Sequence, residues 1–155
     1  MDKWIDGWLE HEELFDTEKS QPWIHEVDVW HKAIELYKLA WRIVNEAGLD
    51  FKLRSQIADA AQSVSANIAE GYSRRSVNEY MQHLYIALGS LSETLSRTIA
   101  LLEAGQISDA QFEELDNLHY EIENKLWNLL KSLEQKKADG SWIAKVSEEP
   151  EGYRA

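Results

Sequence analysis

A single stretch decides the fold: Ser76-Val-Asn-Glu-Tyr-Met-Gln-His-Leu-Tyr-Ile-Ala-Leu-Gly-Ser-Leu-Ser-Glu-Thr-Leu-Ser-Arg-Thr-Ile-Ala-Leu-Leu102. Its apolar and near-apolar positions recur at alternating spacings of four and three, at Val77, Met81, Leu84, Leu88, Leu91, Leu95, Thr98 and Leu102. This spacing is typical of a helix that packs on other helices as in a coiled coil. Ser76 and Glu79 form a capping-box pattern at its start, and Ser108 and Gln111 form a second one before the last helical segment. We therefore expect a long helix over residues 77–102.

Three glycines divide the middle of the chain into four helical segments. Gly48, Gly71 and Gly105 each follow a run of helical periodicity, and both prolines lie outside this middle. A glycine just beyond a helix is typical, because it adopts the left-handed conformation without steric cost. We expect helices that end near these glycines and near Lys137, over residues 28–47, 51–70, 77–102 and 108–137.

The helix surfaces predict how these segments pack. Helix 28–47 has a second apolar stripe, with Trp30, Tyr37 and Trp41, so its apolar face is wider than one neighbour requires. Outside its core stripe, helix 51–70 carries mostly small side chains and is expected to be central. Long helices joined by short loops are antiparallel neighbours. The predicted fold class is all-α, an antiparallel up-down-up-down four-helix bundle over residues 27–137.

The net charge of −12 lies largely outside this bundle. Residues 1–26 hold eight acidic and two basic residues, and residues 138–155 hold four acidic and two basic residues. We interpret them as an acidic, tryptophan-containing N-terminal extension and a C-terminal tail. An acidic chain is poorly suited to binding phosphate backbones non-specifically, although local basic patches on the bundle could still do so.

Composition also restricts the compartment and the chemistry. The chain has no cysteine, which excludes disulfides and thiolate metal sites and fits a cytoplasmic location. No apolar run approaches the ~18 residues of a membrane span, so no membrane partner is expected. The N-terminus lacks the features of a signal peptide. We expect no cofactor.

Polar residues inside the two middle helices are the main candidates for assembly or ligand binding. Serine and asparagine disfavour helix interiors because they compete for backbone hydrogen bonds, so their presence suggests partners on other helices. The candidates are Ser63, Asn67, Glu70, Gly71, Gly89, Ser90 and Glu93. Gly89 and Ser90 suggest a close helix approach. We favour a buried network that fixes helix register, with Arg74 or Arg97 as counter-ion, over a ligand site.

Other candidates have simpler explanations. Lys52, Arg54, Arg74 and Arg75 could contact phosphate, but basic residues beyond a helix C-terminus also suit the helix dipole. His119 lies on an apolar stripe and is expected to be a hydrogen-bonded core residue. The Glu-x-x-His pairs of a di-iron bundle are absent, as are the hydrolase and phosphate-loop motifs.

Tryptophans outside the bundle form the last group of candidates. They are Trp4, Trp8, Trp23 and Trp142. Trp4, Ile5, Trp8 and Leu9 have helical spacing among acidic residues, as in a short amphipathic helix that docks in a partner's groove. The sequence equally allows this segment to pack on its own bundle or on a neighbouring subunit.

The chain resembles the four-helix-bundle family named for proteins encoded in 23S rRNA intervening sequences. This family also includes the accessory variability determinants of diversity-generating retroelements. The resemblance covers residues 27–137 and rests on Ser63, Asn67, Ile68, Ala69, Glu70, Gly71, Arg74, Ser76, Ala87, Gly89, Ser90 and Glu93, with Asp28-Val-Trp-His-Lys-Ala33 at the first helix. Ser65 and Ser73 depart from the pattern, where proline and glycine are usual.

The resemblance implies a ring-shaped homopentamer and, in the retroelement branch, binding to a reverse transcriptase and structured RNA through a basic surface. Our leading hypothesis is a non-enzymatic oligomeric scaffold or adaptor for a protein partner in RNA or DNA processing. Two alternatives are direct RNA binding by a basic patch repeated around the ring, and a structural assembly unconnected to nucleic acid. An enzyme has the least support, because no catalytic constellation is present.

Overall fold

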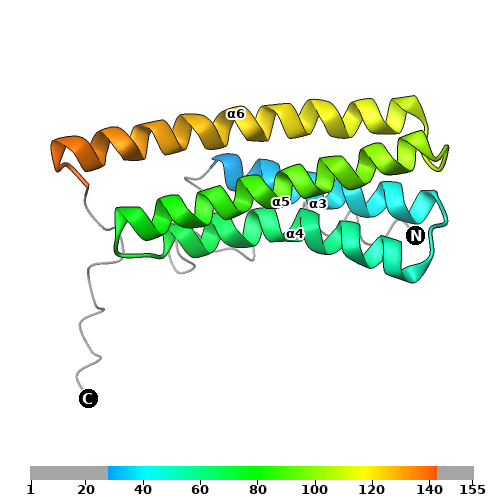
Figure 1. The fold of residues 1–155 in the computed structure, drawn as a ribbon, viewed down its shortest axis with the longest axis horizontal. Coiled ribbons are helices and arrows are strands. Elements are labelled where there is room, and N and C mark those ends of the chain that lie inside the picture. Colours follow the sequence, from blue (N-terminus) through cyan, green and yellow to red (C-terminus); the bar gives the residue numbers. More distant parts are fainter. Residues whose placement is uncertain (1–27, 143–155) are drawn as a thin grey trace, which may run out of the picture.

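The computed structural model describes residues 28–142, and within this range every regular element is a helix (Figure 1). The elements are α3 (Asp28–Glu46), α4 (Phe51–Tyr72), α5 (Val77–Glu103) and α6 (Asp109–Asp139). The predicted all-α four-helix fold is confirmed, and the helix bounds agree with the sequence pattern to within about two residues.

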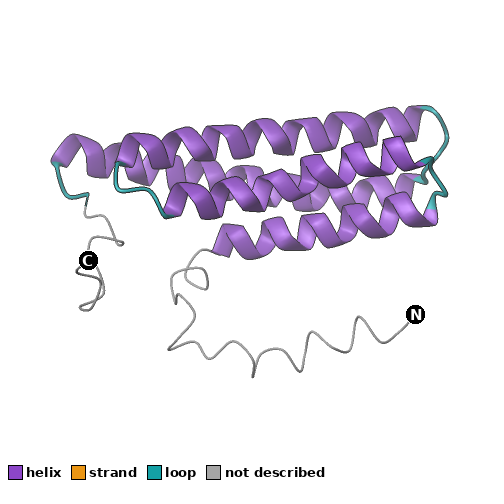
Figure 2. Ribbon diagram, turned by 90° about the horizontal axis from the view of Figure 1, so that it is seen from below, coloured by secondary structure: helices purple, strands orange, loops and turns teal. Residues whose placement is uncertain are grey.

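The helices lie side by side along the long axis of the molecule, with their connections at the two ends (Figures 1 and 2). Each helix packs on the next in the chain, and α6 packs back on α3. Thus α3 and α5 run in the same direction and stand at opposite corners of the bundle. The first residues of α3 and α5 and the last residues of α4 and α6 lie at the same end of the bundle.

The core lies along the central axis and takes aliphatic side chains from all four helices. Burial of this apolar surface is the main favourable term in folding. The largest fully buried side chains are Leu36, Ile43 and Val44 of α3, Val64 and Ile68 of α4, Leu84, Leu91 and Thr94 of α5, and Leu115, Ile122, Leu126 and Leu130 of α6.

Local signals set most of the helix ends. The Asp50 side chain accepts a hydrogen bond from the Leu53 amide at the start of α4. Ser108 and Gln111 form the predicted capping box at the start of α6. The predicted capping box at Ser76 does not form, since its side chain makes no cap hydrogen bond.

Gly71 is a correction to the sequence prediction. Gly48 and Gly105 have the positive φ angles of helix-ending glycines, 63° and 69°. Gly71 instead lies within α4, which continues to Tyr72. A Cβ atom there would stand 2.8 Å from His83 Cβ and 2.9 Å from Tyr80 Cδ2. The missing side chain allows α4 to approach α5 closely.

Candidate functional site

Polar side chains form a continuous seam between α4 and α5. Gln56, Ser63 and Glu70 stand seven residues apart on α4, and His83, Ser90 and Arg97 stand seven residues apart on α5. The antiparallel helices pair these residues as Gln56 with Arg97, Ser63 with Ser90, and Glu70 with His83. We call these six residues, together with Asn67, the polar seam.

The centre of the polar seam is a chain of hydrogen bonds. Ser90 Oγ donates to Ser63 Oγ at 2.9 Å. Asn67 Nδ2 donates to Ser63 Oγ at 3.0 Å and to the Ser63 carbonyl at 2.8 Å. The Asn67 amide orientation leaves Oδ1 to accept from His83 Nδ1 at 3.3 Å. All these groups are partly buried, so the chain ties α4 to α5 at the level of Asn67.

Ion pairs close both ends of the polar seam. Arg74 Nη2 donates to Glu70 Oε1 at 2.5 Å, and the same carboxylate oxygen lies 3.9 Å from His83 Nε2. At the other end, the Arg97 guanidinium donates two hydrogen bonds to Glu93 Oε1 and one, at 3.2 Å, to Gln56 Oε1. Arg74 and Arg97 are therefore both counter-ions, as the sequence suggested.

The arrangement does not activate a nucleophile. A serine nucleophile needs a base within hydrogen-bond reach of its hydroxyl. His83 contacts Asn67 and Glu70 rather than Ser63 or Ser90. The hydroxyl of Ser63 accepts from both neighbours instead. The chemistry of the seam is thus mutual satisfaction of polar groups, which are partly buried at its centre and about half exposed at Glu70.

Gly89 is a second correction. The sequence suggested a close helix approach at Gly89 and Ser90, but Gly89 is exposed and a Cβ atom there would meet nothing within 4 Å in the described chain. Ser90, one residue later, turns into the polar seam. Only Ser90 of this pair contacts α4.

The four predicted basic residues do not form one patch. Lys52 and Arg54 lie in the first turn of α4, whereas Arg74 and Arg75 follow its last turn. Twenty-two residues of helical rise separate Lys52 from Arg74 by about 33 Å. Arg54 also donates to Asn45 Oδ1, and Arg74 pairs with Glu70. The predicted helix over residues 51–70 already separates the two pairs, so grouping them as one patch neglected the length of that helix.

Buried titratable groups lie in the core rather than in a cleft. The His119 side chain is buried on the inner face of α6, and this burial lowers its pKa, against the opposing effect of Glu123 and Asp116. Burial likewise raises the pKa of the Tyr80 hydroxyl. Among residues 28–142, no three metal-ligating side chains are grouped closely enough to hold a metal ion.

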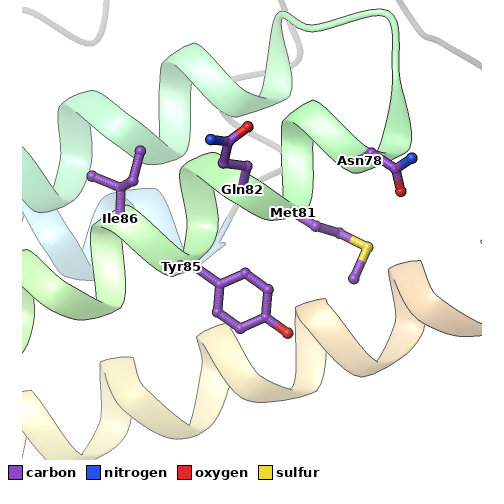
Figure 3. Close-up of a pocket in the computed structure, with 5 residues that line it drawn as sticks. All are labelled: Asn78, Met81, Gln82, Tyr85 and Ile86. Atoms are coloured by element: carbon purple, nitrogen blue, oxygen red, sulfur yellow. The ribbon is translucent and has the colours of Figure 1, made fainter.

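The surface carries several large exposed hydrophobic side chains. Trp41 of α3 stacks on Tyr37, with ring centroids 6.4 Å apart, and is half exposed. On α6, Tyr120 and Trp127 are also exposed. A shallow groove on α5, lined by Asn78, Met81, Gln82, Tyr85 and Ile86, is shown in Figure 3. We call these surfaces the α3 stripe (Tyr37 and Trp41), the α6 surface (Tyr120 and Trp127) and the α5 groove.

The tryptophans of the two tails have different outcomes. Trp142 packs on Tyr80, with ring centroids 5.9 Å apart, and its Nε1 donates to the Arg75 carbonyl. It therefore covers the end of its own bundle. Trp4, Trp8 and Trp23 lie outside the described residues. No helix within residues 28–142 combines the length and hydropathy needed to cross a bilayer.

Comparison with known proteins now identifies the family. The family model described as "23S rRNA-intervening sequence protein" matches residues 25–128, about two thirds of the chain. The chain belongs to this family. Among curated proteins, no sequence matches this chain significantly. The polar seam lies wholly inside the matched range.

One solved structure shares the family fold over nearly its whole length. It is a protein of unknown function from the S23 ribosomal protein family of Bacteroides thetaiotaomicron. The two chains are 25% identical, with a TM-score of 0.62, and the alignment covers 66% of this chain and 98% of the Bacteroides protein. The family model covers α3, α4, α5 and the first two thirds of α6.

Sequence reasoning missed His83 and Gln56 as members of the polar seam. Neither stands out alone, because histidine and glutamine are common on exposed helix faces. The signal that could have found them is the matched seven-residue spacing of polar side chains on two helices that are neighbours in the chain.

Proposed function

We propose that this protein is a non-enzymatic oligomeric scaffold, a ring of five bundles that presents repeated surfaces to a protein partner. The observation that carries the proposal is the division of the side chains between interior and exterior. The polar residues of the family motif bond to one another in the polar seam. Large aromatic side chains stand on the surface instead, where they are enriched at protein interfaces.

Two different aromatic surfaces are what a ring requires. A closed ring forms when one surface of a subunit binds a different surface of the next subunit. The α3 stripe and the α6 surface are our candidates for this pair. Arg42, next to Trp41, pairs with Glu114 of α6, so Trp41 itself is turned about 100° away from that contact. The number of subunits in the proposed ring, five, is taken from the family resemblance.

The partner belongs, in this proposal, to an RNA- or DNA-processing complex such as that of a retroelement reverse transcriptase. A ring repeats each weak contact, so the combined affinity exceeds that of one site. Direct RNA binding has less support because Arg74 is paired with Glu70 and because Lys52 and Arg54 lie at the far end of α4.

Size-exclusion chromatography with light scattering tests the assembly, with absorbance read at protein and nucleic-acid wavelengths. We expect five times the 18.0 kDa mass of one chain, free of nucleic acid. Trp41→Glu and Tyr120→Glu should each lower that mass while helical circular dichroism persists. Ser92→Glu, at an exposed α5 position outside both surfaces, is the control and should leave the mass unchanged.

Two outcomes would contradict the proposal. A monomeric wild-type chain would remove the ring and the avidity that depends on it. Co-purifying RNA that is lost in the Arg74→Glu/Arg75→Glu double variant, with the mass preserved, would establish direct RNA binding instead.

A further inference from the structure

The α5 groove is an apolar surface without charged side chains. Tyr85 and Ile86 are 44% and 45% exposed, although both are large hydrophobic residues. Figure 3 shows Met81 and Tyr85 directed toward α6, with Gln82 and Ile86 on the other flank of α5. Exposed apolar side chains grouped in this way mark a docking surface.

The chain enters the bundle at the level of this groove. Asp28, the first residue of α3, accepts a hydrogen bond from Lys125 of α6. Trp127, two residues further along α6, makes an edge contact with Tyr85, with ring centroids 6.1 Å apart. Two residues of helix rise about 3 Å, so the N-terminal extension leaves the bundle at nearly the same height as the groove.

The charge of α6 favours this end of the bundle for an acidic segment. Residues 109–123 contain six acidic residues and no lysine or arginine, whereas residues 124–142 contain four lysines and two acidic residues. The loop before the groove adds Arg75, whereas Arg74 in the same loop is already paired with Glu70. An extension with eight acidic residues is repelled by the first half of α6 and attracted to the second half.

We propose that residues 4–9 of the N-terminal extension dock in the α5 groove of their own chain. Trp4, Ile5, Trp8 and Leu9 would share one side of a helix about 8 Å long, within the about 12 Å from Asn78 to Ile86. The acidic neighbours of these residues are then attracted to the lysines of the second half of α6.

The tether makes such docking effective even if the contact is weak. Eighteen residues lie between Leu9 and Asp28 and can span up to about 60 Å. A covalent link of this length holds the segment at an effective concentration on the order of 1 mM. A contact too weak to form between separate molecules therefore forms within one chain. The docked segment then prevents other proteins from binding in the groove.

Disulfide trapping in the full chain tests the proposal, because the chain has no cysteine of its own. The test chain carries Glu12→Cys and Gln82→Cys, and the matched control carries Glu12→Cys and Asn117→Cys. Gln82 lines the groove, and Asn117 is an exposed neutral residue on the acidic half of α6. We expect the test pair to oxidise at least ten times faster, and Trp4→Ala with Trp8→Ala to reduce its rate to that of the control.

Three results would overturn the proposal: equal rates for the two pairs, a rate that does not depend on the tryptophans, or a product with the mass of two chains. The last result would place the segment on another copy. Light scattering on the same samples keeps this test separate from the proposed ring, since the tryptophan changes should leave the oligomer mass unchanged.

Discussion

The α4–α5 pair and the α3–α6 pair are both antiparallel neighbours, but different interactions align them. Between α4 and α5, partly buried hydrogen bonds link residues in matched steps of seven, and Gly71 allows close contact. Between α3 and α6, the polar links lie at the surface. They are the ion pairs Asp28–Lys125, Lys32–Glu121 and Arg42–Glu114 and a hydrogen bond from Gln111 to Glu46.

This difference indicates which interactions fix the relative register of the helices. Surface ion pairs contribute about 0–1 kcal/mol and re-form after small shifts, because long side chains follow one another in water. The polar seam is satisfied in only one register, since displacement by one residue would separate every pair. We infer that α4 and α5 define the alignment and that α3 and α6 pack on it through apolar contacts.

The largest expected effect is a difference in the free energy of unfolding between alanine substitutions at two glycines of these helices. Gly71→Ala should destabilise the fold by about 1–2 kcal/mol, because the new Cβ atom would crowd His83 and Tyr80. Gly89→Ala should stabilise it by about 1 kcal/mol, because its Cβ atom meets open space and alanine favours the helix. Urea unfolding of both variants checks the contrast, and changes of equal sign would contradict it.

The next effect compares two asparagines. Asn67 and Asn124 both donate to the carbonyl four residues earlier, but only Asn67 also bonds across helices, to His83. Asn67→Ala should cost about 1–2 kcal/mol because it leaves partners of the seam unsatisfied. Asn124→Ala should be close to neutral. Equal free energies of unfolding for the two variants would show that the cross-helix bond contributes nothing.

Acid should destabilise the bundle through its core histidine. Burial lowers the pKa of His119 in the folded state below its ordinary value of 6.5, so the unfolded chain binds the proton more readily. The stability from His119 is therefore full above pH 7 and is lost as pH falls through 6.5 toward the folded pKa. The melting temperature of His119→Gln should fall less steeply with decreasing pH than that of the wild type. An equal pH dependence in the two proteins would show that His119 is not responsible for the loss of stability in acid.

The smallest expected effect concerns the α3–α6 ion pairs. Glu114→Gln removes the partner of Arg42 at a position where both side chains are about half exposed. The free energy of unfolding should change by less than about 0.5 kcal/mol. A loss above about 1.5 kcal/mol in urea unfolding would mean that surface ion pairs align α3 with α6 after all.

Much of the fold was predictable because local rules decide it. The four-three spacing on α5 and the Ser108–Gln111 capping box each act within one helix, and the structure confirms them. Gly71 was misread because a helix-ending glycine and a glycine at a close helix contact look the same in sequence. The difference lies in Tyr80 and His83 on the facing helix.

The candidate site was only half predictable for the same reason. Ser63, Asn67 and Glu70 were recognised because polar residues are unfavourable within a helix. His83 and Gln56 join them through the pairing of two helices, which the spacing within one helix does not contain. The grouping of Lys52 and Arg54 with Arg74 and Arg75 failed because the length of α4 separates them.

The central claim is that the family's polar motif joins α4 to α5, and a double-mutant cycle on Asn67 and His83 tests it most directly. The free energies of unfolding of Asn67→Ala, His83→Ala and the double variant give the coupling energy between the two side chains. We predict a favourable coupling of about 1 kcal/mol, because these residues bond to each other across the seam. Strictly additive losses, or single variants as stable as the wild type, would contradict the claim.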